Sequence, residues 1–234
     1  MKKKIFVGLF IIGLCVLLVG CKENKKEETK EDTKVGGWTL NKDTKAVAIP
    51  EEAEKAFKDA IKDYKDMTLD PMVLLATQVV SGKNYMFLCK GTKDNTTDYR
   101  VSIVYKDLNG VSKITKVSKF DVEKYVSKTI DAPTEQLDGG WQVYGNIDEY
   151  MIEKDAYDVF ESATKKLTGV KYSPLALIAK QVVSGTNYAI LSLGTLTTGE
   201  QSQTHVYLLT IYKDLQNNVN LTSIAYVDLA EFNK

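Results

Sequence analysis

Few side chains in this sequence have the chemistry of an active site. The single histidine is His205, and Cys89 is the only cysteine outside the N-terminal region. A Cys–His pair can supply a nucleophile and its base, but no third residue that would orient the base is evident. Asp94, Asn95 and Asp98 carry oxygen ligands without the spacing of an EF-hand loop, so a solvated turn is the simpler interpretation. An enzyme therefore has little support, and we expect neither a metal nor a cofactor.

Composition excludes further classes of function. The chain has 31 basic and 31 acidic residues, so its charge gives no reason to expect a nucleic-acid partner. It contains no phosphate-binding loop, dinucleotide-binding glycine turn or zinc-ligand spacing. Apolar residues make up 44% of the chain, which is enough for one large core or two small ones.

The N-terminus has the pattern of an export signal. Three lysines, Lys2–Lys4, precede an apolar run over Ile5–Val19 that is too short for a stable membrane span. The run ends in Leu18-Val19-Gly20-Cys21, which resembles the lipobox of bacterial lipoproteins. That resemblance implies cleavage before Cys21, a lipid on its thiol and an extracytoplasmic protein anchored to the cell membrane. An ordinary secretory signal followed by a chance cysteine is the alternative.

The sequence between the signal and residue 36 is nearly all Lys, Glu, Asp, Asn and Thr. Such a composition buries too little apolar surface to offset the entropy of ordering, so we expect a disordered tether. The expected organisation is a signal at 1–20, a tether at 21–35, a first repeat at 36–125, a linker at 126–138 and a second repeat at 139–234.

The two repeats are visible directly in the sequence. Gln78–Tyr85 reads QVVSGKNY and Gln181–Tyr188 reads QVVSGTNY. The same offset takes Gly36-Gly37-Trp38 to Gly139-Gly140-Trp141. Beyond a short insertion in the second repeat, Tyr105–Leu108 matches Tyr212–Leu215 as YKDL. Repeats of this length are typical of domains rather than solenoid units.

Each repeat has the pattern of one helix followed by β-hairpins. Apolar residues recur at helical spacing, as Ala53, Phe57, Ala60, Ile61 and Tyr64 and again as Ala156, Phe160, Ala163 and Leu167. Expected strands at 38–40, 72–80, 84–90, 99–106 and 111–120 are separated by turns at 81–83 and 107–110. We therefore predict an α+β fold of two tandem domains, each with one helix packed on a four- to five-stranded antiparallel sheet, and we expect each to fold alone.

A glycine pair, a helix, Gln-Val-Val-Ser-Gly and a later hairpin occur in this order in both repeats, and the order resembles that of the cystatins, in particular the stefin type. The resemblance implies tandem cystatin-like domains that inhibit papain-like cysteine peptidases with a wedge made of a glycine trunk and two hairpin tips. The residues that it assigns to peptidase binding are Gly36, Gly37, Trp38, Gln78, Val79, Val80, Ser81, Gly82, Leu108, Asn109 and Gly110, with Gly139, Gly140, Trp141, Gln181, Val182, Val183, Ser184, Gly185 and Leu215 in repeat two.

Some features leave alternatives open. The Pro-Trp pair of many cystatins is absent, and repeat two has Leu215-Gln216-Asn217 without a glycine where repeat one has Leu108-Asn109-Gly110. We therefore expect repeat two to have the longer second turn and to inhibit less well. The first hairpin could also be purely structural, and both tryptophans could cover the edge of a helix. A non-inhibitory binding protein of the cell envelope is the competing hypothesis.

Overall fold

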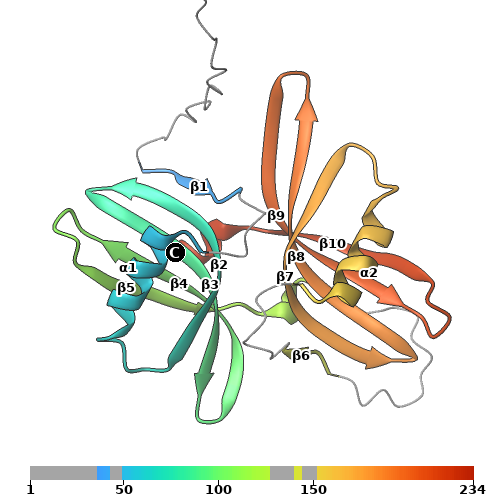
Figure 1. Cartoon of the computed structure of the whole chain (residues 1–234), viewed down its shortest axis with the longest axis horizontal. Helices are drawn as coiled ribbons and strands as arrows, with labels where there is room; N and C mark the ends of the chain where they lie inside the picture. Colours follow the sequence, from blue (N-terminus) through green and yellow to red (C-terminus); the bar gives the residue numbers. More distant parts are fainter. Residues whose placement is uncertain (1–35, 43–48, 127–139, 144–151) are drawn as a thin grey trace, which may run out of the picture. The chain divides into compact units, whose positions relative to one another are not determined.

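The computed structural model describes residues 36–42, 49–126, 140–143 and 152–234 (Figure 1). The expected signal and tether, including Cys21, lie outside the described residues, as do positions 127–138 of the expected linker and Gly139. Thr33–Lys234 belongs to one compact unit. Within the described part of the chain, no helix is both long enough and apolar enough to cross a membrane.

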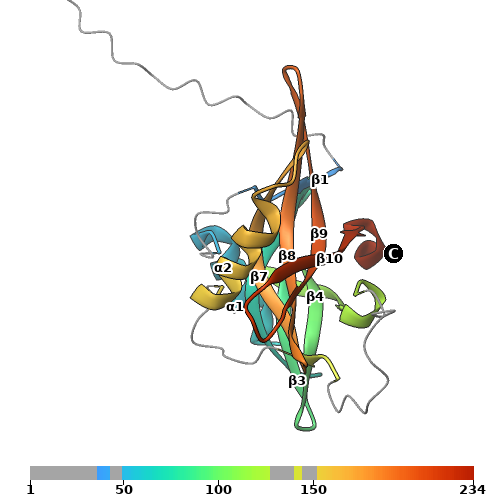
Figure 2. The same ribbon diagram turned by 90° about the vertical axis from the view of Figure 1, so that its right-hand side faces the viewer.

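Each repeat forms one antiparallel meander (Figures 1 and 2). The first sheet contains β1 (Trp38–Leu40), β2 (Thr68–Val80), β3 (Gly82–Lys93), β4 (Thr96–Lys106) and β5 (Ser112–Lys119), in that order, with helix α1 (Glu51–Ile61) between β1 and β2. The second sheet contains β6 (Gln142–Val143), β7 (Val170–Val183), β8 (Gly185–Thr198), β9 (Gln201–Lys213) and β10 (Val219–Val227), with α2 (Lys154–Thr164) before β7. Short 3-10 helices follow at Val122–Lys124 and Leu229–Asn233.

The helices are held by the apolar stripes that the sequence predicts. Ala53, Phe57 and Ala60 are buried against the first sheet, where the rings of Phe57 and Phe87 meet edge to face at 5.1 Å. Ala156 and Phe160 do the same in repeat two. Burying a phenylalanine side chain stabilises the fold by about 2–3 kcal/mol, so these contacts fix the helices more firmly than helix propensity does.

The predicted α+β class of two tandem helix-on-sheet, cystatin-like domains is wrong, because antiparallel sheet dominates the described residues. The two α-helices have 11 residues each, whereas β7 and β8 have 14 each. The strands are longer than expected because backbone ladder bonds continue through polar ends such as Thr92 paired with Thr97, which hydrophobic alternation does not reveal. Leu167, predicted in the second helical stripe, lies beyond the end of α2 and is exposed.

The central strands are buried on both faces. On β3, Tyr85 and Phe87 point into the cluster with α1, while Met86 and Leu88 belong to another cluster. This second cluster takes in residues of both sheets, including Leu191 of β8. Phe120 of repeat one also stacks on Phe232 of repeat two at 5.9 Å. The second face of each sheet therefore lies in a core to which both repeats contribute.

Candidate functional site

Three segments of repeat one meet at one end of the first sheet, and we call them the first wedge: the trunk Gly36–Trp38, the first tip Val79–Gly82 and the second tip Asp107–Val111. The strand registers bring them together, because Trp38 pairs with Gln78 and Lys83 pairs with Lys106. This register agrees with the expectation that the trunk and the two tips lie side by side. We call the corresponding segments of repeat two, Gly140–Gln142, Val182–Gly185 and Asp214–Asn218, the second wedge. There Gln142 pairs with Lys180, and Thr186 pairs with Lys213.

The trunk lies along β2 rather than free of it. The amide of Gly36 donates to the carbonyl of Val79 at 3.0 Å, while Gly36 itself is exposed with φ +88°. Trp38 and Trp141 pack against the cluster that both sheets share. The tryptophans therefore cover the core that both sheets share, rather than the edge of a helix as the structural alternative proposed.

The first tip is a very tight turn. Val80 pairs with Gly82, so Ser81 alone connects β2 and β3. Gly82 has φ +125°, and a Cβ there would lie 2.3 Å from the carbonyl oxygen of Lys106. Only glycine fits both the backbone conformation and this approach of β4. Val79 and Val80 are left among the exposed large apolar side chains.

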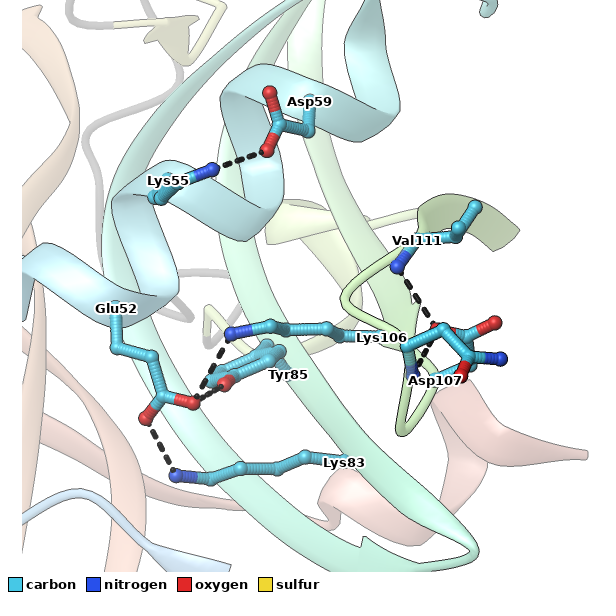
Figure 3. A network of polar contacts seen from close by, with 9 residues as sticks. Glu52, Lys55, Asp59, Lys83, Tyr85, Lys106, Asp107 and Val111 are labelled. Carbon is cyan, nitrogen blue, oxygen red and sulfur yellow. Dashed lines mark hydrogen bonds and ion pairs between the residues drawn. The ribbon is translucent and has the colours of Figure 1, made fainter.

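The second tip is a five-residue turn that Asp107 holds closed. Its carboxylate accepts a hydrogen bond from the amide of Val111 at 2.8 Å (Figure 3). It also accepts one from the amide of Asn109 at 2.9 Å. Gly110 takes φ +87°. Leu108 is 83% exposed and Val111 is also exposed, so this turn presents apolar side chains to solvent at the end of the sheet.

The second tip of repeat two has the same construction, and the expectation of a longer turn is wrong. Asp214 accepts from the amides of Gln216 and Asn218, each at 2.8 Å. Asn217 takes φ +65° where repeat one uses glycine, because asparagine tolerates the left-handed region better than most residues. Leu215 is 75% exposed. The turn therefore needs no glycine to keep its shape.

Gln78 braces the first wedge from within. Its side-chain amide donates to the carbonyl of Gly36 at 2.9 Å, and its side-chain oxygen accepts from Asn84 at 2.7 Å. Gln181 accepts from Asn187 at 2.8 Å in the same way. The resemblance to cystatins assigns Gln78 and Gln181 to peptidase binding, and in the structure both side chains also brace the stems of their hairpins.

A charged cluster that the sequence reading missed lies behind both tips. Glu52, in the first turn of α1, accepts from Tyr85 at 2.7 Å and pairs with Lys83 at 3.2 Å and Lys106 at 3.4 Å (Figure 3). Lys83 follows the first tip and Lys106 precedes the second, so one carboxylate joins both stems to the helix. The hydrogen bond from Tyr85 and the two lysines lower the pKa of Glu52.

Repeat two contains a related cluster. Asp155 of α2 accepts from Tyr188 at 2.5 Å and pairs with Lys213 at 2.6 Å. The bond from Lys213, followed by that from Tyr188, lowers the pKa of Asp155. Glu52, Tyr85 and Lys106 align with Asp155, Tyr188 and Lys213, so a comparison of the repeats for paired acids, tyrosines and lysines would have revealed the cluster.

The remaining candidates for chemistry lie apart. Cys89 is fully buried in the α1 cluster, and burial raises the pKa of its thiol to about 12, which makes it a poor nucleophile. His205 is exposed on β9 beside the ring of Tyr226. Asp94 and Asn95 form the turn between β3 and β4, and Asp98 pairs with Arg100 at 2.6 Å. Among the described residues, no group of three or more His, Cys, Asp or Glu side chains could hold a metal ion.

No protein-family model matches the sequence, and no match is found among curated proteins. The two repeats of this chain can, however, be compared with each other. Both copies keep the glycine of the first tip, the aspartate of the second tip and the carboxylate behind them.

Proposed function

We propose that this protein is a surface-tethered inhibitor of papain-like cysteine peptidases, which blocks the active-site cleft with its wedges. The observation that carries the proposal is the meeting of a glycine-containing trunk and two rigid tips at one end of a sheet. Both tips bear exposed apolar side chains there, Val80 and Leu108 in repeat one. The peptidase cleft, which is built for extended peptide, would bind such a surface. The wedge would present no scissile bond to the catalytic cysteine of the enzyme.

Rigidity is what makes so small a surface effective. Binding loses affinity when loops must be ordered, and turns that are already fixed avoid most of that cost. In both wedges the aspartate side chain closes the second tip, and a glycine fits the first tip under the neighbouring strand. Leu108, Val182 and Leu215 are then presented in defined positions, as anchors of a small interface need to be.

The proposal includes the cellular location that the sequence indicates. A lipid on Cys21 would hold the protein on the outer face of the cell membrane, and the charged segment up to residue 35 would separate the wedges from the lipid surface. On that face, the protein would encounter peptidases of a host, of a competitor or of the cell itself. No nucleic-acid partner is proposed.

One observation favours the competing class, a non-inhibitory binding protein. The trunk is hydrogen-bonded to β2 through Gly36, whereas an inhibitor would need it to face the enzyme. The exposed valines of the first tip, Val79 and Val80, favour a binding role over a purely structural hairpin. The same tips could contact another envelope protein or a wall polymer.

Inhibition assays separate the two classes. The full chain in mild detergent is titrated against papain and related cysteine peptidases, with trypsin as a serine peptidase control. We expect inhibition of the cysteine peptidases at nanomolar to low micromolar concentration and none of trypsin. If papain-like enzymes stay active at high micromolar concentration, the binding-protein alternative replaces the proposal.

A further inference from the structure

In both repeats a tyrosine hydroxyl connects the two hairpins of the wedge. Tyr105 of β4 donates to the backbone carbonyl of Ser81, the residue at the apex of the first tip, at 2.5 Å. Tyr212 of β9 donates to the carbonyl of Ser184 at the same distance. Each hydroxyl reaches the tip from the strand that leads into the second tip, so the contact spans the two loops.

The ring of each tyrosine also occupies the space that the glycine leaves. A Cβ on Gly82 would lie 3.0 Å from ring carbon Cε2 of Tyr105, and one on Gly185 would lie 2.8 Å from Cε2 of Tyr212. Glycine therefore lets the aromatic ring approach closely enough for its hydroxyl to reach the carbonyl of the preceding serine. The glycine of the Gly-x-Asn-Tyr segment and the tyrosine of the Tyr-Lys-Asp-Leu segment therefore pack together in each repeat.

The apex carbonyl would otherwise depend on solvent. Ser81 is the sole residue between the paired Val80 and Gly82, and such a turn lacks the internal bonds that hold the second tip. The hydrogen bond from the Tyr105 hydroxyl, on an adjacent strand of the sheet, holds this carbonyl in place. The Tyr105 hydroxyl thus holds the apex of the first tip against β4, beyond the point where the ladder pairing of Lys83 with Lys106 ends.

We propose that Tyr105 and Tyr212 are the positioning residues of the two wedges, which fix the first tip relative to the second for binding. The inference rests on the proposed function, because a peptidase cleft would fit only one spacing between the first and second tips. The tyrosines act through the tips and need not touch the partner themselves. Losing the hydroxyl should leave the fold intact, let the first tip move and shorten the life of the complex.

The test uses the full chain with Tyr105→Phe, Tyr212→Phe and both changes together. Tyr226→Phe is the matched control, since it removes the hydroxyl of an exposed tyrosine on β10 that pairs with Tyr207, away from the Val219 end of the strand that follows the second tip. Hydrogen exchange at residues 80–83 and 183–186 measures tip mobility, and stopped-flow kinetics with papain measures dissociation. A denaturation midpoint for each variant identifies any general loss of stability.

We expect the tip amides to exchange roughly tenfold faster in the phenylalanine variants, in the manner of a local opening. Dissociation of the double variant should be roughly fivefold faster with little change in association, as is usual for interface changes. Tyr226→Phe should change neither tip exchange nor dissociation. The proposal is overturned if tip exchange is unaltered, or if it rises while dissociation stays at the wild-type rate. If the wild-type chain does not bind papain, the proposed function fails by itself, and the exchange rates still decide whether the hydroxyls fix the tips.

Discussion

The side-chain amide of Gln78 donates to the backbone carbonyl of Gly36 at 2.9 Å, across 42 positions of sequence. This bond attaches the trunk to the stem of the first hairpin. Gln78→Leu should therefore release the trunk and lower the free energy of unfolding by about 1 kcal/mol. Urea denaturation measures the change, with Gln201→Leu on an exposed strand end as control. Equal midpoints for both variants would show that the brace contributes nothing.

Two glycines with positive φ should respond very differently to alanine. At Gly82 a Cβ would meet the Lys106 carbonyl at 2.3 Å, whereas nothing lies within 4 Å of a Cβ at Gly110. Gly82→Ala should cost about 2–4 kcal/mol, through strain and displacement of β4, and Gly110→Ala about 1 kcal/mol, from the left-handed backbone alone. Thermal denaturation gives both values. Similar losses at the two positions would contradict the close approach seen at the first tip.

The shared cluster changes the expectation for isolated repeats. Fragments 36–126 and 140–234 would each expose the apolar sheet face that carries Met86 or Leu191 in the intact chain. We expect both fragments to aggregate or to melt without a cooperative transition, and the full chain to unfold in one transition. Calorimetry and light scattering test this. Two separable transitions, each reproduced by a fragment, would restore the prediction of independent domains.

Acid should weaken the clusters behind the tips. The pKa values of Glu52 and Asp155 are lowered in the folded protein, so the stability that they contribute is fully present above their unfolded pKa values and is lost as the pH falls through the folded ones. Stability should thus decline below about pH 4.5. In Glu52→Gln the decline should be shallower, with Glu51→Gln as control. The denaturant midpoint of each protein is measured across this pH range. If the cluster has no such role, the midpoints of wild type and Glu52→Gln will fall equally steeply with pH.

The N-terminal prediction concerns residues outside the described structure. Because Leu18-Val19-Gly20-Cys21 closes a short apolar run, Cys21→Ala should leave an unprocessed precursor and abolish incorporation of labelled palmitate in a bacterial host. Cys15→Ala, within the apolar run, is the matched control and should be processed normally. Normal labelling of the Cys21→Ala protein would refute the lipoprotein assignment.

Local features were predictable where a residue type allows few conformations. The short strand at 38–40, the turn at Ser81-Gly82 and the turn at Asn109-Gly110 lie where glycine and alternation place them. Helix α1 begins directly after Pro50, whose fixed φ suits a helix start. The burial of Ala53 and Phe57 follows from their spacing.

Long-range relationships were not accessible from those patterns. A buried strand such as β3 has apolar residues on both faces, and alternation cannot say that its second face lies in a core common to two repeats. The bonds of Tyr105 and Gln78 depend on strand register, which a tight turn fixes only once its length is known. The sequence therefore indicated the segments of the wedge and missed the side chains that hold them together.

The most direct test of the wedge places a charge on the tips. Leu108 and Leu215 are 83% and 75% exposed, so glutamate at both positions should leave the fold intact while placing charges against an apolar cleft. Leu196→Glu is the matched control, because Leu196 is exposed on β8 near the opposite end of the strands. Inhibition constants against papain are measured for wild type, the Leu108→Glu/Leu215→Glu double variant and Leu196→Glu. The account predicts that the inhibition constant of the double variant is weaker by about 30-fold or more, equivalent to about 2 kcal/mol. The inhibition constant of Leu196→Glu should equal that of wild type. Undiminished inhibition by the double variant would contradict it.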